Sequence, residues 1–264
     1  MKKYLVIGNP IDHSLSPELH NHWIKHNNID AVYDKRKLND TQIKQCVSDI
    51  KNQIISGLNV TVPFKNIIIP YLDKLSDDAK KTQSVNTIYL KNQKVIGHNT
   101  DIEGFVKAIK KINYDFTGKK IFILGAGGVV TSLIYASMKM GSSDIFVTNR
   151  TKKKAEKIKN IFNNIKLIEW GYIPDFDVII NATSLGLKQE DKINLDFTKI
   201  GKNKLFYDVI YNPSETSFLK TGKELGNRFE NGKLMFIYQA FLAFKLWHGV
   251  EPVIDIQTTK LLDR

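Results

Sequence analysis

The chain has 264 residues, 42% of them hydrophobic and 25% charged, and a formal net charge of +12, which is typical of a globular protein of one large or two modest domains. The single cysteine, Cys46, excludes an internal disulfide and a cysteine-based zinc site, and no stretch approaches the roughly 18 apolar residues of a membrane span. The positive charge is scattered without a basic block or a nucleic-acid-binding motif, so we expect a cytoplasmic protein with neither a nucleic-acid nor a membrane partner.

Apolar runs and helical patterns alternate through the first hundred residues. We expect strands over residues 3–8, 31–38, 56–62, 84–90 and 94–98, the last two forming a hairpin through Asn92-Gln93. We expect a helix from Pro17 with Ser16 as its N-cap, and further helices over residues 40–50, capped by Asp40, 63–72 and 77–82.

Candidate chemical groups lie where predicted strands end. Ser14 and Ser16 occupy a loop after the first strand, where both hydroxyls can be presented to a ligand. Lys65 falls on the first turn of the helix that Pro63 opens, where the helix dipole disfavours a cation. This position indicates an anionic partner or a function, although a solvated lysine is the competing interpretation. Asp101 falls in the first turn of a helix over 102–112, where the dipole favours an acid, so a structural role alone explains it.

Two histidines of the first predicted helix have the spacing of metal ligands. His22 and His26 are four residues apart, but no carboxylate or cysteine completes a set of ligands. We therefore predict no metal site.

A glycine turn lies at the centre of the second half of the chain. The apolar run 121–124 ends in Gly125-Ala126-Gly127-Gly128, a helical pattern follows over 129–140, and a second apolar run covers 145–147. Strand, turn, helix and strand fit the size of a βαβ unit, in which the turn lets a pyrophosphate approach the helix N-terminus. The third position of the fingerprint is Val130 rather than Gly or Ala, which predicts slightly looser packing of the helix on the strand.

The residues after the second strand of this unit indicate which dinucleotide binds. An NAD site usually carries an acidic residue there, whereas an NADP site carries an arginine. Here Asn149-Arg150-Thr151 is followed by three lysines, and no carboxylate appears before Glu156. Arg150 can form a two-pronged contact with a 2′-phosphate, and a lysine can add a point charge. For Lys152 and Lys153 a solvated helix face explains the sequence equally well.

Strands and helices continue to alternate after this unit. We expect helices over residues 152–162, 216–225 and 234–247, and strands over 177–181 and 205–209. Gln239 interrupts the apolar surface of the last of these helices, where it is expected to bond either a backbone carbonyl or a ligand. The alternation predicts an α/β fold with mainly parallel sheets covered on both faces. We place residues 1–100 and about 238–264 in an α/β substrate domain, and residues 101–237 in a Rossmann-like NADP-binding domain.

Several motifs together resemble those of the shikimate dehydrogenase family along the whole chain. They are Gly8-Asn9-Pro10, His13-Ser14-Leu15-Ser16-Pro17, Asn59-Val60-Thr61-Val62-Pro63-Phe64-Lys65, Val85-Asn86-Thr87, Asn99-Thr100-Asp101, Gly125-Ala126-Gly127-Gly128, Asn149-Arg150-Thr151, Asp208-Val209-Ile210-Tyr211-Asn212-Pro213 and Tyr238-Gln239-Ala240. Their order and spacing are more specific than any one motif. The resemblance implies the reversible reduction of 3-dehydroshikimate to shikimate by NADPH, a step in aromatic amino-acid biosynthesis. Whether the protein is a monomer or a homodimer stays open.

The resemblance also implies a role for individual residues. Lys65 and Asp101 would be the catalytic pair. The substrate would be held by Ser14, Ser16, Thr61, Lys65, Asn86, Asp101, Tyr211 and Gln239. The NADP cofactor would be held by Asp77, Gly125, Ala126, Gly127, Gly128, Val129, Asn149, Arg150, Thr151, Lys154, Val209 and Gly232.

Three positions, Ile102, Val130 and Leu234, depart from the family's pattern, and none of them removes a reacting group. They concern the fit of the cofactor more than the chemistry. A quinate/shikimate dehydrogenase that uses NAD is one alternative, and a catalytically silent NADP-binding protein on the same fold is another. Arg150 and the pair Ser14 and Ser16 favour the NADP-linked shikimate enzyme.

Overall fold

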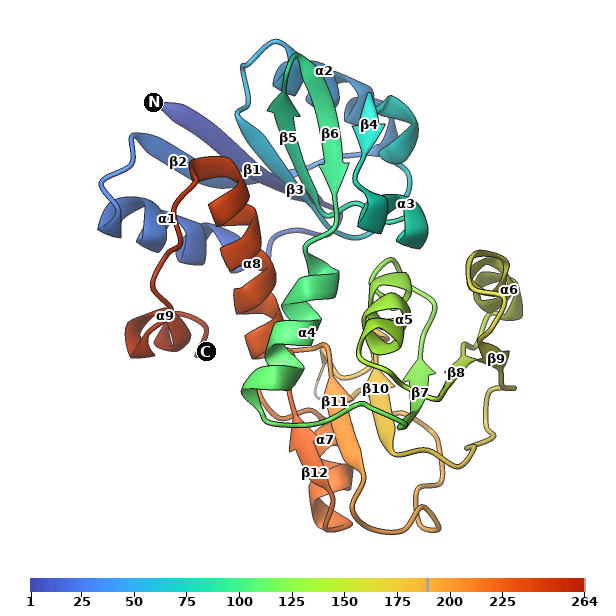
Figure 1. Ribbon diagram of the computed structural model, residues 1–264. Coiled ribbons are helices and arrows are strands. Elements are labelled where there is room, and N and C mark those ends of the chain that lie inside the picture. Colours follow the sequence, from blue (N-terminus) through green and yellow to red (C-terminus); the bar gives the residue numbers. More distant parts are fainter. Residues whose placement is uncertain (189, 264) are drawn as a thin grey trace. The chain divides into compact units, whose positions relative to one another are not determined.

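The computed structural model describes residues 1–188 and 190–263, which form two compact units (Figure 1). Unit 1 contains Met1–Gly104 and Ile237–Leu262, so its two parts are far apart in the sequence. Unit 2 contains the described residues of Phe105–Phe236 together with Asp263. The helices α4 (Asp101–Lys111) and α8 (Lys233–His248) each contain residues of both units.

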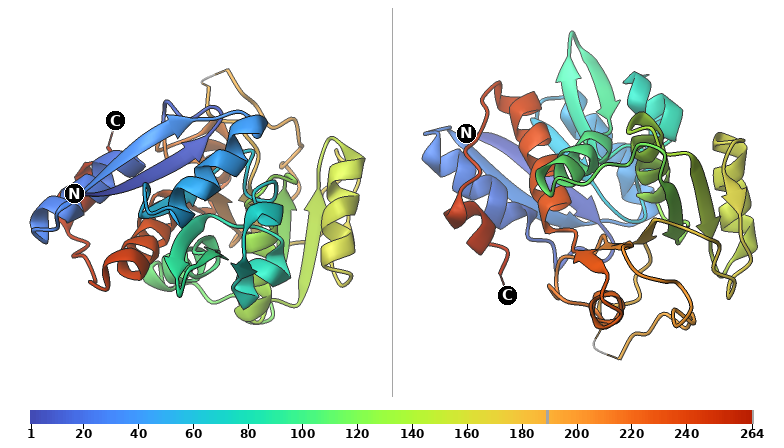
Figure 2. Two further views of the ribbon diagram at one scale, coloured as in Figure 1. Left: turned by 90° about the horizontal axis from the view of Figure 1, so that it is seen from above. Right: turned by 60° about the horizontal axis from the view of Figure 1, so that its bottom comes forward.

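Unit 1 is built on a six-stranded mixed sheet with the strand order β2-β1-β3-β5-β6-β4. Its strands are β1 (Lys2–Gly8), β2 (Ala31–Lys37), β3 (Gly57–Val60), β4 (Lys74–Leu75), β5 (Thr87–Lys91) and β6 (Lys94–His98). The pairs β1–β2, β1–β3 and β4–β6 are parallel, whereas β3–β5 and β5–β6 are antiparallel. The predicted hairpin through Asn92-Gln93 is confirmed as β5–β6, which Figure 2 shows in teal and green.

The helices of unit 1 cover both faces of this sheet. They are α1 (Ser16–His26), α2 (Ile43–Lys51), α3 (Asp77–Thr82), α9 (Ile256–Lys260), the parts of α4 and α8 that belong to unit 1, and the 3-10 helices η1 (Asp40–Gln42) and η2 (Ile69–Tyr71). On one face, Leu5 and Leu58 join a buried apolar cluster with residues of α2. On the other face, Tyr4 packs against Trp247 of α8, with ring centroids 5.0 Å apart. Successive strand residues point to opposite faces, so both faces are apolar.

Two predicted N-caps in unit 1 are wrong. The residue before the first turn of α1 is Leu15, no side chain caps this helix, and Ser16 is its first residue. The segment predicted as a helix from Asp40 begins with η1, where Asn39 and Gln42 form a reciprocal capping box. The backbone N–H of Asn39 donates to Oε1 of Gln42 over 2.9 Å, so the residue before the first turn is Asn39 rather than Asp40.

The predicted helix over residues 63–72 is also wrong. Residues 62–68 form a series of turns, and only Ile69–Tyr71 adopt a 3-10 helix. Pro70 lies inside the predicted helix and disfavours α-helical geometry at the residue before it, and the preceding run of β-branched isoleucines is a weak helix former. Lys65 consequently lies in a turn after β3, and the helix-dipole argument for it does not apply.

Unit 2 is built on a six-stranded sheet in which all five pairings are parallel. The strand order is β12-β11-β10-β7-β8-β9. Its elements are β7 (Lys120–Leu124), α5 (Val130–Lys139), β8 (Asp144–Thr148), α6 (Lys152–Ile161), β9 (Lys166–Leu167), β10 (Val178–Asn181), β11 (Leu205–Asp208), α7 (Ser217–Glu224) and β12 (Arg228–Glu230). The chain moves outward from β7 to β9 and then returns to β10 beside β7. The strand order therefore reverses between β7 and β10, and α/β proteins bind ligands at the carboxyl ends of the strands at such a point.

The sheet of unit 2 is fixed by close packing of aromatic side chains. Phe206 on β11 is fully buried and lies against Phe218 of α7 with a centroid distance of 5.1 Å. Gly222 allows α7 to approach, because a Cβ at this position would lie 2.5 Å from the ring of Phe206. This packing holds β11 in place, and with it the loop that follows its carboxyl end.

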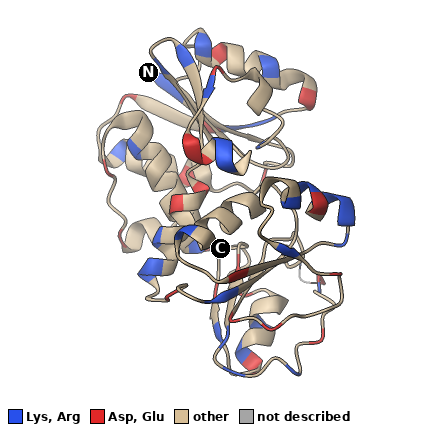
Figure 3. Cartoon of the chain, turned by 45° about the vertical axis from the view of Figure 1, so that its right-hand side comes forward, with Lys and Arg blue, Asp and Glu red and all other residues tan. Residues whose placement is uncertain are grey.

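The positive charge is distributed over the structure in the scattered way that the sequence predicts. Lys and Arg are present on many elements of both units (Figure 3). None of the helices in residues 1–188 and 190–263 is long and apolar enough to cross a membrane.

Candidate active site

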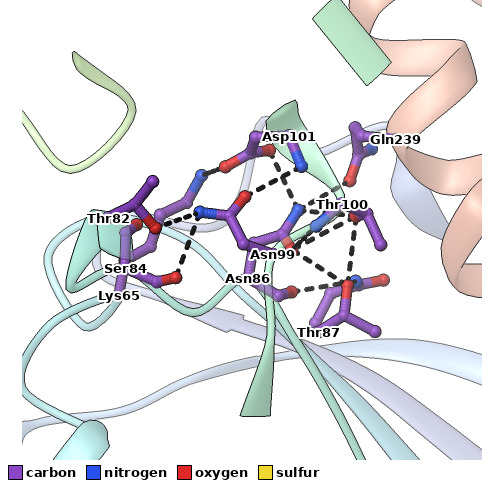
Figure 4. Close-up of polar contacts among 10 residues, drawn as sticks. Lys65, Thr82, Ser84, Asn86, Thr87, Asn99, Thr100, Asp101 and Gln239 are labelled. Atoms are coloured by element: carbon purple, nitrogen blue, oxygen red, sulfur yellow. Dashed lines mark hydrogen bonds and ion pairs between the residues drawn. The ribbon is translucent and has the colours of Figure 1, made fainter. Parts of the chain in front are cut away.

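The centre of the candidate site in unit 1 is an ion pair between Lys65 and Asp101. The Lys65 Nζ atom lies 2.5 Å from Oδ2 of Asp101, and the two side chains are only 10% and 7% exposed (Figure 4). A buried charge is costly unless it is paired and hydrogen-bonded. The two residues are 36 positions apart, so their contact depends on the tertiary fold.

Asn86 connects this pair to the other polar groups of the site. Its Nδ2 group donates to Oδ1 of Asp101 over 2.9 Å and to Oγ1 of Thr100 over 2.8 Å. Its Oδ1 atom accepts from the backbone N–H of Thr100 over 2.7 Å. Asn86 therefore holds the carboxylate oxygen that does not contact Lys65, and it fixes the orientation of the Asp101 side chain.

The start of α4 is held by a second asparagine. The backbone N–H of Asp101 donates to Oδ1 of Asn99 over 3.1 Å. The Asn99 Nδ2 group in turn donates to Oγ1 of Thr82 and to the carbonyl oxygen of Ser84, each over 3.1 Å. Asn99 thus positions the first turn of α4, and its own side chain is fixed by buried partners.

Gln239 reaches the same network from α8. A Cβ at Gly104 would lie 2.9 Å from the backbone nitrogen of Gln239, so the missing side chain lets α4 and α8 approach closely. The Oε1 atom of Gln239 accepts from Nδ2 of Asn86 over 3.4 Å. The predicted partners of this glutamine are a backbone carbonyl and a ligand. In this contact the partner is instead the side-chain amide of Asn86.

The predicted serine pair lies at the start of α1. The Oγ atoms of Ser14 and Ser16 are 3.3 Å apart, and the backbone N–H of Ser16 donates to Oγ of Ser14 over 3.4 Å. Thr61 follows β3 and is half-buried, and its backbone N–H donates to the carbonyl oxygen of Ile7 over 2.9 Å. Tyr211 belongs to unit 2, where its ring stacks on Phe236 with a centroid distance of 4.4 Å.

The prediction missed buried polar residues that join these groups. Asn59 donates to the carbonyl oxygen of Asn86 over 3.0 Å and to Oγ1 of Thr87 over 3.1 Å. It also accepts from the hydroxyl of Tyr33 over 2.7 Å. An asparagine inside the fully buried strand β3 is a signal that could have found this site, because a buried amide must be bonded.

The glycine turn of unit 2 lies at the switch point of its sheet. Gly125 has a φ of +119°, and a Cβ there would lie 2.8 Å from the carbonyl oxygen of Ala182, which follows β10. Only glycine suits this position. A Cβ at Gly127 would meet no atom within 4 Å, so its missing side chain leaves open space beside the turn. Ala126, Gly128 and Val129 complete the turn before α5 begins at Val130.

Val209 and Gly232 lie in contact beside the second loop of this sheet. A Cβ at Gly232 would lie 2.1 Å from the carbonyl oxygen of Val209. The adjacent Asp208 is buried and accepts hydrogen bonds from Thr216, Asn181 and the backbone of Ile210. Burial raises the pKa of Asp208 to about 6 despite these bonds. The Asp208 carboxyl group therefore connects the loops that follow β10 and β11 through its hydrogen bonds.

The basic residues predicted to select the cofactor follow β8. Asn149 donates from Nδ2 to the carbonyl oxygen of Thr151 over 2.9 Å, and Thr151 is the residue before the first turn of α6. Arg150 and Lys154 are exposed, and within the described ranges neither forms an ion pair. Asp77 lies in unit 1 at the first position of α3, with a 93% exposed side chain.

The described part of the chain holds no cluster of three or more His, Cys, Asp or Glu side chains that could bind a metal. His22 and His26 lie close together, with ring centroids 4.1 Å apart, and a hydrogen bond joins the His26 ring to the His22 carbonyl.

The parallel sheet with its glycine turn and the buried Lys–Asp pair define a protein of the two-unit α/β dehydrogenase class. A model of the shikimate dehydrogenase substrate binding domain matches residues 6–88, and a model of shikimate / quinate 5-dehydrogenase matches residues 107–207. The shikimate dehydrogenase (NADP(+)) of Pelagibacter ubique is 54% identical over 262 residues, which cover 99% of each chain. The chain belongs to the shikimate dehydrogenase family.

Solved structures agree with this assignment. A crystal structure of shikimate dehydrogenase from Aquifex aeolicus has a TM-score of 0.90 to this chain at 38% identity and covers 99% of this chain and 97% of its own. A structure of shikimate 5-dehydrogenase from Listeria monocytogenes, in complex with shikimate and NAD, has a TM-score of 0.90 at 30% identity, with 99% and 96% covered.

Proposed function

We propose that the protein is an NADP-dependent shikimate dehydrogenase that interconverts 3-dehydroshikimate and shikimate in aromatic amino-acid biosynthesis. The observation that carries this proposal is the buried pair of Lys65 and Asp101, joined through Asn86 to Gln239, in a chain with 54% identity to an enzyme of that name. Unit 1 would bind the substrate, and unit 2 would bind the nucleotide.

Lys65 is proposed to supply the proton in this reaction. In the direction of reduction, the substrate carbon receives a hydride and the carbonyl electron pair moves to the oxygen, which then needs a proton. The Lys65 ammonium can donate that proton and stabilise the developing negative charge. Asp101 remains ionised and holds the Lys65 side chain through its 2.5 Å contact. The nicotinamide, when bound, provides or accepts the hydride.

The surrounding polar groups are proposed to hold the ring of the substrate. A ring with several hydroxyls needs donors and acceptors on several sides, and Thr61, Asn86 and Gln239 provide them. The substrate carboxylate suits the hydroxyls of Ser14 and Ser16. Because Ser16 does not cap α1, its side chain is not committed to the helix backbone. Tyr211 stays a prediction for this site.

The residues of unit 2 fit a phosphorylated dinucleotide. The open space at Gly127 allows a pyrophosphate to approach the N-terminus of α5, where the helix dipole favours an anion. The exposed guanidinium of Arg150 is suited to the 2′-phosphate of NADP. We propose that Asn149, Thr151, Lys154, Val209 and Gly232 complete the part of the cofactor site that unit 2 provides. Asp77, which belongs to unit 1, stays a prediction for cofactor binding.

We also propose that the protein acts in the cytoplasm. The proposal is supported by the cysteine content, because a chain of 264 residues with one cysteine, Cys46, has no internal disulfide to stabilise it, as is usual for proteins of a reducing compartment.

A steady-state assay tests the function. Shikimate and quinate are each offered with NADP and with NAD, and the absorbance of the reduced nicotinamide is followed. We expect the highest kcat/KM for shikimate with NADP. Equal use of quinate or NAD would instead support a quinate/shikimate dehydrogenase, and no turnover with any of the four combinations would leave only a silent NADP-binding protein.

A further inference from the structure

A buried amide–carboxylate pair lies at the carboxyl edge of the sheet in unit 2. Asn181 is the last residue of β10 and Asp208 is the last residue of β11, and the two are partners in the parallel register of these strands. Both are fully buried. The Nδ2 group of Asn181 donates to both carboxylate oxygens of Asp208, each over 3.1 Å. The pair therefore joins two neighbouring strands at the edge where α/β proteins bind their ligands.

Asp208 holds the loop that follows β11. Its Oδ1 atom accepts from the backbone N–H of Ile210 over 3.0 Å, and its Oδ2 atom accepts from the hydroxyl of Thr216 over 2.7 Å. The carbonyl oxygen of Ile210 accepts from the backbone N–H of Gly232 over 3.1 Å. These bonds fix the segment that carries Val209 and hold Gly232 beside it.

Asn181 holds the loop that follows β10. Its Oδ1 atom accepts from the backbone N–H of Thr183 over 3.1 Å and from the Thr183 hydroxyl over 2.7 Å. Its Nδ2 group also donates to the carbonyl oxygen of Leu185 over 3.0 Å. This loop packs against the glycine turn, because a Cβ at Gly125 would lie 2.8 Å from the carbonyl oxygen of Ala182. One pair of side chains therefore fixes the loop after β11 relative to the glycine turn.

A carboxylate at position 208 suits these bonds better than an amide would. The Nδ2 group of Asn181 lies equally close to both oxygens of Asp208, so Asp208→Asn would place an N–H2 group beside that of Asn181 in either orientation. Burial disfavours the charged form of a carboxyl group. The hydrogen bonds that Asp208 accepts offset this cost, and they are the same bonds that hold the loop.

The strand order indicates which half of a dinucleotide meets these loops. Arg150 follows β8 on one side of β7, whereas Asn181 and Asp208 end β10 and β11 on the other side. A dinucleotide binds across such a switch point with its pyrophosphate at the glycine turn. If the 2′-phosphate is at Arg150, the adenosine half lies over β8 and the nicotinamide half lies over β10 and β11.

We propose that Asn181 and Asp208 are positioning residues that hold the loops after β10 and β11 in the geometry that receives the nicotinamide half of NADP. The inference rests on the proposed function, because it assumes that unit 2 binds this cofactor with its 2′-phosphate at Arg150. Since both side chains are fully buried, they act through the backbone that they hold.

The test measures binding by isothermal titration calorimetry with two probes. They are NADP and adenosine 2′,5′-bisphosphate, which has the 2′-phosphate but lacks the nicotinamide half. Asp208→Asn should weaken the binding of NADP by about fivefold or more, the effect of a lost hydrogen bond, and that of the bisphosphate by less than about twofold. The control Asp177→Asn makes the same change before β10, at the other end of the strand, where Asp177 accepts from the backbone N–H of Lys120 over 2.9 Å. It should leave both affinities within about twofold of the wild type.

Two variants of Thr216 test the inference if Asp208→Asn does not fold. The Thr216 hydroxyl donates to Asp208 and accepts from the backbone N–H of Leu219 in α7. Thr216→Val removes these bonds and should weaken the binding of NADP selectively, whereas Thr216→Ser keeps the hydroxyl and should bind both probes like the wild type. Thermal unfolding shows which variants are folded.

Unchanged NADP affinity in a folded Asp208→Asn or Thr216→Val protein would overturn the inference and leave the proposed function intact. An equal loss of affinity for both probes would do the same, because it would indicate a general loosening of unit 2. A wild type that does not bind NADP would overturn the proposed function, and this inference with it.

Discussion

Gly232 lies so close to Val209 that a side-chain carbon at Gly232 would be 2.1 Å from the Val209 carbonyl oxygen. No atom pair of this kind can be accommodated without a shift of the backbone. The contact fixes the loop after β11 against the segment that leads into α8. Both residues are proposed to contact the cofactor, so the packing of this loop and the binding of NADP depend on the same glycine.

Gly232→Ala should therefore impair both stability and cofactor binding. We expect a loss of roughly 1–3 kcal/mol in the free energy of unfolding, as for other overpacked sites. The KM for NADP should rise, while the KM for shikimate should change little. Urea unfolding and steady-state kinetics measure the two effects, and a variant with wild-type stability would show that the contact is less tight than described.

Gly127→Ala should weaken the binding of the cofactor without changing the stability of the fold. A Cβ at Gly127 meets no protein atom within 4 Å, so the unfolding midpoint should stay that of the wild type. The methyl group would occupy the space proposed for the pyrophosphate, so we expect the KM for NADP to rise by about tenfold or more, since tenfold corresponds to about 1.4 kcal/mol. Unaltered NADP kinetics in this variant would place the pyrophosphate elsewhere.

Lys65→Ala should lower kcat by roughly 10²–10⁴-fold, the range for a lost general acid or base. The KM for shikimate should change much less. The variant also leaves the Asp101 carboxylate buried without its partner, so its unfolding midpoint should fall. Lys94→Ala removes an exposed lysine of β6 and serves as the control. Near-normal turnover by a folded Lys65→Ala protein would exclude the proposed role.

Arg150→Ala should remove most of the preference for NADP over NAD. A charge-assisted bond to the 2′-phosphate contributes roughly 1.5–3 kcal/mol, which corresponds to a preference of about ten- to a hundredfold. The loss should be in kcat/KM for NADP, with little change for NAD, and the wild-type preference should shrink as salt rises. Lys153→Ala also removes one positive charge, three residues from Arg150. It therefore controls for the effect of the overall electrostatic field on cofactor binding. If Arg150→Ala kept the full preference, the assignment would be wrong.

His20 should make the fold sensitive to acid. Burial and the nearby His248 lower the pKa of His20 to about 3. Its folded pKa lies below the unfolded value of about 6.5, so its contribution to stability is complete above about pH 6.5 and is lost as the pH falls towards 3. His20→Phe keeps a flat ring against Tyr33 and removes this titration. The urea midpoint of the wild type should fall more between pH 7 and pH 5 than that of His20→Phe, whereas the exposed His13→Gln should behave like the wild type.

Local patterns in the sequence predicted the long elements well. The predicted helix over residues 77–82 has the observed bounds of α3, and the other helices with clear periodicity are displaced by only a few residues at their ends. The short strands β4 and β9 were missed because two residues are too few to show a period of two. The predicted helix over residues 63–72 is wrong because Pro63 is compatible with a helix start, whereas Pro70 prevents a regular helix through this segment.

The residues of the candidate site could be predicted only where they belong to a motif of the family. Lys65 and Asp101 came from the family resemblance, since their contact requires the turn after β3 to meet the start of α4. That meeting depends on long-range bonds such as the one from the backbone N–H of Val85 to the carbonyl oxygen of Lys65, over 2.8 Å. The link from Tyr33 to Asn59 has no local signature, because it joins side chains on two strands that are separated by β1.

The discontinuity of unit 1 in the sequence has a consequence for folding during synthesis. The aromatic face of its sheet, with Tyr4 and Tyr33, is covered in part by Trp247 of α8. Phe244 of the same helix lies against His20 of α1. The ribosome makes these residues only after all of unit 2, which takes several seconds at about 5–20 residues per second. Apart from Asp263, the described residues of unit 2 lie in one continuous segment, Phe105–Phe236, so this unit can fold while the aromatic face of unit 1 is still open. We expect nascent chains that stop before α8 to bind chaperones through this face.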